Sequence, residues 1–218
     1  MCGRLNQKLS TADIKSAFGT DDARIDPLTP NYNVPPSSRI YGVVGKGPRR
    51  IETFRWGLVP PWAKEPSSRF SMHNARADGV ATKRSFKTAF RSRRSLIPAD
   101  GFYEWQKGPG GKQPFYIYRL DGMPLAFAGL WEFNEPLALR SCTIITTDAN
   151  EFMSQVHHRM PVVLEPEDWD RWLDPENDDL DVLSSLLKPA ADGVLSMHAV
   201  HVMVGNPREN SARVVEPL

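Results

Sequence analysis

The sequence predicts an α+β fold, a single domain with a largely antiparallel, barrel-like β core flanked by short helices. Segments typical of strands outnumber helical ones, and they follow one another as hairpins. The chain has 218 residues, 40% of them hydrophobic, which is enough for one domain over residues 1–218 with a sizeable core. Its 19 prolines are spread over many loops, and no linker, repeat or low-complexity tract divides it.

The first elements expected are a helix and a hairpin. Residues 10–18, STADIKSAF, predict a short helix that Ser10 caps and Gly19 ends. RIYGVVG and IETFRWGLV, residues 39–45 and 51–59, are typical of two strands joined by the turn KGPRR.

The middle of the chain predicts one helix and four strands. SFKTAF, residues 85–90, is expected to be a helix behind Ser85 as its cap. GFYEWQ and PFYIYRL flank the turn-rich KGPGGK and indicate a β-hairpin over residues 101–106 and 114–120. The apolar stretches at residues 124–133 and 140–147 indicate two buried strands.

The last part of the chain predicts three helices and a late strand. Residues 149–156 are expected to form a helix that leads into HHRMPVVL, residues 157–164. Two further helices are expected at residues 166–173 and 179–187, and a strand at residues 194–204.

The composition narrows the classes of function. No run of about 18 apolar residues predicts a membrane span, and the polar start MCGRLNQKLS lacks the apolar core of a signal peptide. The two cysteines are therefore expected to stay reduced, and the expected compartment is the cytoplasm, next to the nucleoid when the protein is bound to DNA. No clustered Cys/His pattern predicts a metal site, and we expect no cofactor.

The net charge of +1 hides an uneven distribution of charge. Eight Lys or Arg and one acid lie between Arg69 and Arg94, whereas nine acids and one base lie in residues 165–181. One interpretation of each run is a solvated face without a partner. The alternative for the basic run is single-stranded nucleic acid, because phosphates suit arginine and bases stack on aromatic rings. Such rings lie within the run and beside it: Phe70, Phe86, Phe90, Trp56, Trp62 and Trp105.

Cys2 follows the initiator methionine, and a small second residue usually permits removal of Met1. The new terminus then carries an amine with a reference pKa of about 7.7–8.0 beside a thiol with one of about 8.5. The unprotonated amine attacks an aldehyde to form a Schiff base, and the thiol closes onto the imine carbon to give a five-membered thiazolidine. An aldehyde trap is thus one interpretation of Cys2, and a chance cysteine is the other.

Three further motifs hold polar groups that suit catalysis or phosphate binding. NARAD offers the amide of Asn74 and the planar guanidinium of Arg76. PADGFYEW places Glu104 between two aromatic residues, where a buried carboxyl can act as acid or base. HHRMP places His157 and His158 before a strand, and an imidazole side chain can shuttle protons near pH 7. Taken singly, each also fits a surface or turn residue with no chemical role.

Together, MCGR, RWGLVPPWAK, HNARAD, SFKTAFRSRRSLIPADGFYEW, ITTDAN and HHRMPVVL resemble the SOS response-associated peptidase (SRAP) family, in the family's order and over nearly the whole chain. Two departures are Ser95, where many members have Cys, and Asp78, where Glu is usual. The resemblance implies a protein that binds single-stranded DNA containing abasic sites. It also implies a thiazolidine crosslink between Cys2 and the ring-opened abasic aldehyde, and a self-cleavage that frees Cys2.

The resemblance also implies roles for individual residues. Cys2 would supply the amine and the thiol, and Asn74 would orient Cys2 and the sugar. Glu104 would assist ring opening, and His157, which matches the first position of the family's H-x-R-M-P pattern, would shuttle protons. We expect the DNA contacts to come from Arg4, Trp62, Arg76, Arg84, Trp105, Thr146 and Arg159.

Two alternatives to this function remain. Class II glutamine amidotransferases also begin with a catalytic cysteine, although PADGFYEW and HxRMP are not part of their pattern. A single-strand-binding module without catalysis, in which Cys2 is incidental, is the other. We expect a monomer in each case.

Overall fold

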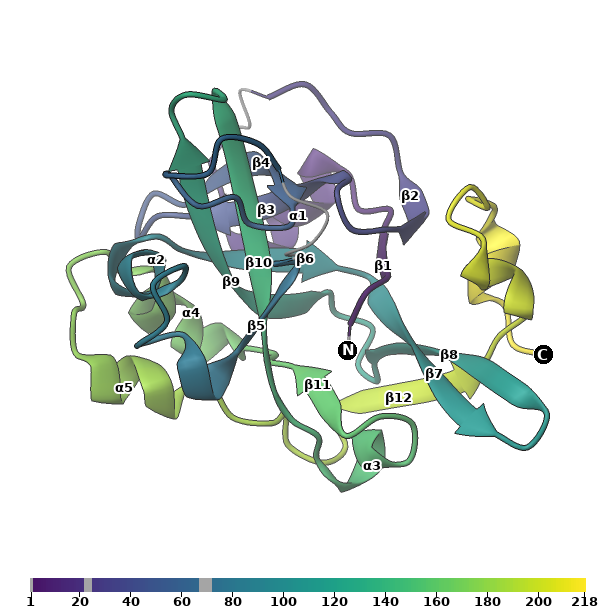
Figure 1. Cartoon of the computed structure of the whole chain (residues 1–218). Coiled ribbons are helices and arrows are strands. Elements are labelled where there is room, and N and C mark those ends of the chain that lie inside the picture. The colour runs from purple at the N-terminus through teal and green to yellow at the C-terminus, as the bar shows by residue number, and fades with distance from the viewer. Residues whose placement is uncertain (1, 22–24, 67–71) are drawn as a thin grey trace.

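The structure is a computed structural model, and it describes residues 2–21, 25–66 and 72–218. Its elements follow one another as a mostly β chain with short helices (Figure 1). The strands are β1 (Leu5–Gln7), β2 (Asn31–Val34), β3 (Arg39–Val44), β4 (Arg50–Trp56), β5 (Asn74–Arg76), β6 (Arg94–Ala99), β7 (Gly101–Gly108), β8 (Gly111–Arg119), β9 (Leu125–Asn134), β10 (Leu139–Asp148), β11 (Arg159–Pro161) and β12 (Leu195–Ala199). The helices are α1 (Thr11–Phe18), α2 (Lys87–Ser92), α3 (Glu151–Ser154), α4 (Pro166–Leu173) and α5 (Leu180–Ser185).

Five strands close into a barrel, in the order β10–β4–β3–β6–β9 and back to β10. All of these pairs are antiparallel except β10 with β4. Two short strands, β5 and β11, pair with the last residues of β10. Three chain segments therefore lie next to one another at the end of β10. The predicted α+β fold with antiparallel sheets and a barrel-like core is therefore confirmed.

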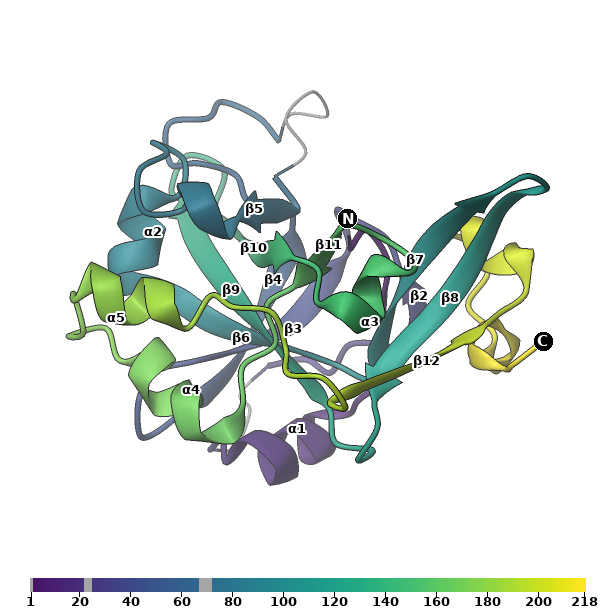
Figure 2. The same ribbon diagram turned by 90° about the horizontal axis from the view of Figure 1, so that it is seen from below.

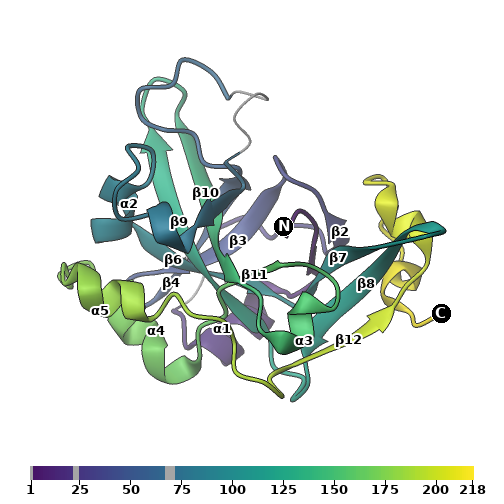
Figure 3. The ribbon, with the colours of Figure 1, turned by 60° about the horizontal axis from the view of Figure 1, so that its bottom comes forward.

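A second, wholly antiparallel sheet stands beside the barrel, in the order β12–β8–β7–β1–β2. In the views from below, its long β7–β8 hairpin lies to one side and α2, α4 and α5 lie to the other (Figures 2 and 3). Side chains from both sheets, among them Phe102 and Phe127, share one apolar cluster, which also contains Cys2 and Cys142 as free, buried thiols. The start of β1 is thereby held between the two sheets.

Helix α1 follows the expected local rules. The Ser10 side chain accepts a hydrogen bond from the Asp13 N–H, and Gly19 ends the helix in the left-handed conformation at φ 60°. Ile14 and Phe18 are its buried residues. Because both signals are local, the sequence predicted this helix within a residue.

Four predictions of local structure were wrong. The strand expected over residues 51–59 ends at Trp56, because Gly57 takes a φ of 126° that a strand does not allow. Helix α2 begins at Lys87 behind Phe86, which makes no side-chain cap, so Ser85 is not the cap. The late strand stops at Ala199, and the 3₁₀ turn Val202–Gly205 follows it.

The fourth error concerns Asn74–Arg76, for which the sequence predicts no element and which forms β5. Three residues show no period of their own, and this strand exists because β10 pairs with it. The short strands β1 and β2 were not predicted, for the same reason.

The basic run is not one continuous surface. Arg69 and Phe70 lie outside the described residues. Arg94 is buried, and its guanidinium donates to the backbone carbonyls of Phe90 and Trp172. Part of the acidic run is likewise paired with basic residues of other elements, in the ion pairs Asp170–Arg49, Asp174–Lys46 and Glu165–Arg119.

No helix in the described parts of the chain is both long enough and apolar enough to cross a bilayer.

Candidate functional site

Cys2 lies immediately before β1, whose register against β7 decides where it sits. Leu5 pairs with Phe102, and the Tyr103 N–H donates to the Arg4 carbonyl at 3.0 Å. The Cys2 side chain is completely buried. The segment that begins at Cys2 is therefore fixed by the sheet hydrogen bonds of Arg4 and Leu5.

Asn74 holds Cys2 from the other side. Its Nδ2 donates to the Cys2 carbonyl oxygen over 2.7 Å. Asn74 reaches this position because β5 pairs with β10, where Asn74 lies opposite Ile144. The buried Oδ1 of Asn74 has no hydrogen-bond partner among the described residues. It is thus an acceptor that these described residues leave available to another group.

Glu104 lies on β7 and is 3% exposed, which excludes the surface glutamate considered from the sequence. Burial raises its pKa above the ordinary value for a glutamate. The pKa of the Cys2 thiol is also raised, first by burial and then by the negative charge of Glu104. The charge of Glu104 thus acts on the thiol, and burial favours the protonated forms of both groups.

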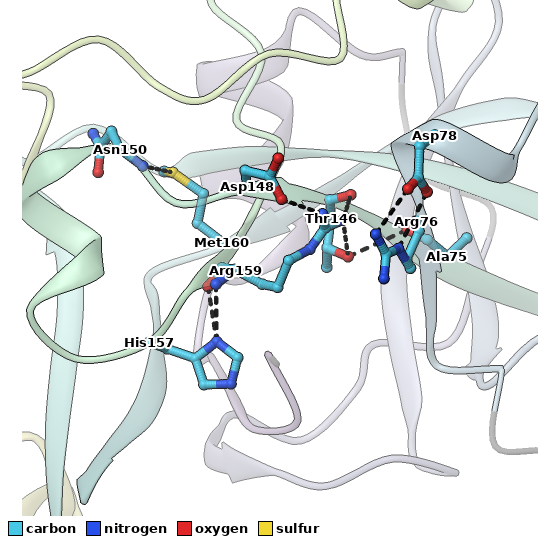
Figure 4. Close-up of polar contacts among 9 residues, drawn as sticks. All are labelled: Ala75, Arg76, Asp78, Thr146, Asp148, Asn150, His157, Arg159 and Met160. Carbon is cyan, nitrogen blue, oxygen red and sulfur yellow. Dashed lines mark hydrogen bonds and ion pairs between the residues drawn. The ribbon is translucent and has the colours of Figure 1, made fainter.

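His157 follows α3 and lies where β11 begins. Its Nδ1 accepts a hydrogen bond from the Arg159 N–H at 3.0 Å (Figure 4). Its ring stacks on that of His158, with centroids 4.4 Å apart. Burial lowers its pKa, so the neutral imidazole is favoured near pH 7.

Thr146 on β10 brings the two arginines of the motifs together. It pairs with Arg76 of β5 on one side and with Pro161 of β11 on the other. Arg159 is buried, and its Nη2 donates to the Thr146 carbonyl at 2.6 Å (Figure 4). The Thr146 hydroxyl is itself buried and bonded to the Ala75 carbonyl, at 3.4 Å.

The remaining candidates for DNA contacts lie in two places. Trp62 is 51% exposed, and the Arg84 guanidinium lies over its ring, 4.5 Å from the centroid. Arg4 lies over Trp105 at 5.9 Å, and its Nη1 donates to Asn33 Oδ1 and the Val204 carbonyl. The first pair is open to a ligand, whereas Arg4 is already bound within the protein.

A cavity of about 570 Å³ lies beside Trp62. Its lining is mostly apolar and includes Trp56, Trp62 and Met72. Met72 precedes His73, whose ring meets that of Trp56 edge-on at 5.8 Å.

His73 lies in the motif HNARAD and is a further candidate, to which the sequence assigned no role. Burial lowers its pKa, as it does for His157. Its position directly before Asn74 was the available signal. In the part of the chain that the structure describes, no group of three or more His, Cys, Asp or Glu could hold a metal ion.

Comparisons with known proteins show the family to which the chain belongs. The family model of the SOS response associated peptidase (SRAP) matches residues 1–207. The chain is 40% identical over 222 residues to the abasic site processing protein YoqW of Bacillus subtilis strain 168, and the alignment covers 99% of each. It is 31% identical over 228 residues to the abasic site processing protein YedK of Escherichia coli strain K12, and the alignment covers 100% of each. The crystal structure of a protein from Bacteroides thetaiotaomicron matches it with a TM-score of 0.88 at 25% identity, over 100% of both chains.

Proposed function

The chain belongs to the SOS response associated peptidase family, and from this premise we propose that it processes abasic sites in DNA. The lesion would be captured in single-stranded DNA, through a covalent bond to Cys2. The observation that carries the proposal is the setting of Cys2, whose backbone carbonyl is held by Asn74 beside the buried carboxyl of Glu104.

The reaction begins once Met1 has been removed and the amine of Cys2 is free. The amine nitrogen attacks the aldehyde carbon of the ring-opened abasic sugar, and the carbonyl oxygen leaves as water. The thiol sulfur then adds to the imine carbon while its proton passes to the nitrogen, which closes the thiazolidine. The ring closure is intramolecular, so it gains from a high effective concentration. Atoms balance without an oxidant, a reductant or a cofactor.

Glu104 and His157 are the proposed proton carriers. A carboxyl with a raised pKa can protonate the ring oxygen of the closed sugar, which releases the aldehyde, and can later protonate the departing hydroxyl. A neutral imidazole can accept a proton from the attacking amine. Asn74 fixes Cys2 and offers its free Oδ1 to a sugar hydroxyl.

The DNA strand would be held by residues around Cys2, Asn74, Glu104 and His157. Arg76 and Arg159 would contact phosphates, and Trp62 and Trp105 would stack on bases. Arg84 supports the Trp62 ring, and Thr146 lies between the two arginines. Arg4 would contact a phosphate while its guanidinium stays hydrogen-bonded to Asn33.

Intact mass spectrometry tests the proposal directly. The purified protein is measured before and after incubation with a single-stranded oligonucleotide that contains one abasic site. The expected result is a protein without Met1 that gains the mass of the oligonucleotide minus one water. An oligonucleotide with a reduced, aldehyde-free site is the control. Absence of an adduct from protein whose Met1 is shown to be removed would refute covalent capture.

Self-cleavage that frees Cys2 is part of the same proposal, and it matters when a residue still precedes the cysteine. A glutamine amidotransferase would be revealed by glutamine hydrolysis without DNA. The family match and the full-length likeness to abasic site processing proteins support the DNA reaction instead. A binding module without chemistry would give no complex on a denaturing gel.

A further inference from the structure

Each of the two arginines assigned to the DNA backbone is already engaged by a carboxylate. Arg76 donates from Nη2 and Nε to the two carboxylate oxygens of Asp78, over 2.7 and 3.1 Å. Arg159 donates from Nη1 to Asp148 Oδ1 over 2.7 Å. Figure 4 shows both pairs side by side across Thr146. A phosphate that binds here has to share or replace these partners.

The four charges form one cluster rather than two separate pairs. The strand β5 that carries Arg76 and the strand β11 that begins with Arg159 flank the same end of β10. Besides its bond to Arg76, the Asp78 carboxyl has its pKa lowered by the charge of Arg159. The charge of Asp148 in turn contributes to the raised pKa of Arg76. Each of the two arginines is therefore matched by a carboxylate at the place where phosphates are expected.

The carboxylates can leave this cluster more easily than Arg159 can. The side chains of Asp78 and Asp148 are 62% and 86% exposed. The Arg159 side chain is only 7% exposed and stays fixed by its hydrogen bond to the Thr146 carbonyl. Phosphate oxygens offer the same kind of acceptor as carboxylate oxygens, in a geometry that guanidinium groups also fit. The aspartates thus stand where a phosphate would bind, and they can turn away into water.

We propose that Asp78 and Asp148 are specificity-determining residues, which compete with strand phosphates for Arg76 and Arg159 and so keep the binding of undamaged DNA weak. This inference rests on the proposed function, because it takes the two arginines as phosphate contacts. Competition lowers the affinity for every strand, but a covalently captured lesion does not depend on that affinity. The ratio of captured lesions to occupied undamaged sites therefore rises.

The test measures the affinity for a fluorescein-labelled oligothymidylate, which has phosphates but no abasic site. Asp78→Asn and Asp148→Asn keep the shape and remove the charge. We expect about a two- to fivefold gain in affinity for Asp78→Asn, whose ion pair is exposed, and about three- to tenfold for Asp148→Asn, whose arginine is buried.

Asp121→Asn is the matched control. Asp121 accepts from Arg119, two residues earlier, over 2.7 and 3.0 Å, in the same local arrangement as Asp78 and Arg76. It lies on the turn between β8 and β9, away from β5 and β11 (Figure 2). Its substitution changes the net charge equally, and it should leave the affinity within about 1.5-fold of the wild type.

A second comparison shows whether Asp78 acts through Arg76. In an Arg76→Ala background, Asp78→Asn should no longer raise the affinity, because the group for which it competes is gone. An equal gain with and without Arg76, or an equal gain from Asp121→Asn, would mean a general charge effect and would overturn the proposal.

The outcome is separable from that of the proposed function. Wild-type protein that binds oligothymidylate but never crosslinks an abasic oligonucleotide would refute covalent capture, and the binding comparison would still decide the role of the aspartates. Wild-type protein that crosslinks, with Asp78→Asn and Asp148→Asn variants that bind no tighter, would refute the competition alone.

Discussion

The proposed reactive pocket, formed by Cys2, Asn74, Glu104 and His157, and the proposed strand surface, formed by Trp62, Arg76 and Arg84, differ in their exposure to water. Cys2 and Glu104 are 0% and 3% exposed, whereas Trp62 is 51% exposed. In the pocket, burial sets the protonation state of the acid, the thiol and the imidazole. On the surface, charges and rings act through solvent, where salt screens them. Chemistry should therefore respond to single buried groups, and strand binding to the sum of several weak contacts.

Blocking the terminal amine should have the largest effect, because it should abolish covalent capture and leave strand binding intact. An alanine inserted between Met1 and Cys2 leaves the thiol in the chain and moves the free amine to another residue. Covalent capture should fall to zero while binding to undamaged strand persists, provided that no self-cleavage removes the extra residue. A denaturing gel with mass spectrometry of the terminus measures both.

Cys2→Ser is the companion variant, because it keeps the amine and loses the thiol. It should give an adduct that borohydride traps and that is short-lived without it. A durable crosslink from the alanine-extended protein, with its extra residue still present, is the result that would contradict attack by the amine.

Glu104→Gln and His157→Ala should have the next largest effect, a slower crosslinking reaction. General acid–base groups contribute about 10²–10⁴-fold to a rate, so single-turnover crosslinking should slow by that order. Affinity for undamaged strand should hardly change, because neither group lies on the strand surface. His158→Ala is the control for His157, as it removes the stacked neighbour alone. Wild-type rates in both variants would reassign the proton carriers.

Trp62→Ala should affect binding where the pocket variants do not. Loss of one stacked base costs about 1–3 kcal/mol, so the dissociation constant should rise by roughly tenfold. The crosslinking rate at saturating protein should stay near that of the wild type. Phe133, another exposed aromatic ring, lies near Arg140 and offers Phe133→Ala as a control. Equal losses from both variants would argue against stacking on Trp62.

Arg76→Ala and Arg159→Ala test how much charge contributes to strand binding. Each lost phosphate contact should reduce the slope of log affinity against log salt by about 0.7. Fluorescence anisotropy over a series of salt concentrations measures it. An unchanged slope in both variants would show that neither arginine contacts a phosphate.

The smallest expected effect is on stability. Burial raises the pKa of Glu104, so the folded protein keeps this proton to a higher pH than the unfolded chain does. The unfolded chain then binds fewer protons, and the contribution of Glu104 makes the free energy of unfolding fall as pH rises above about 4.3. Glu104→Gln removes this contribution, so its stability relative to wild type should increase with pH. Urea unfolding at several pH values would contradict the prediction if the two curves ran parallel.

Several features of the molecule could be predicted because their signals are local. Ser10 and Gly19 bound α1 through contacts within one turn of chain. The alternation around the KGPGGK turn predicted the β7–β8 hairpin, whose two strands need only each other. The α+β class followed from such segments. The chemical character of an amine beside a thiol at Cys2 is likewise a property of the residue itself.

Other features needed the tertiary structure, because they depend on segments far apart in the chain. Asn74–Arg76 becomes a strand only where β10 pairs with it, and that pairing brings Asn74 to the Cys2 carbonyl across 72 positions of sequence. The sequence does not decide whether Glu104 faces water or the core. Glu104 is buried because the two sheets pack together. The carboxylates on Arg76 and Arg159 are short-range in sequence, yet their union into one neutral cluster requires β5, β10 and β11 side by side. Burial and long-range pairing are properties of the whole fold, and the local sequence does not encode them.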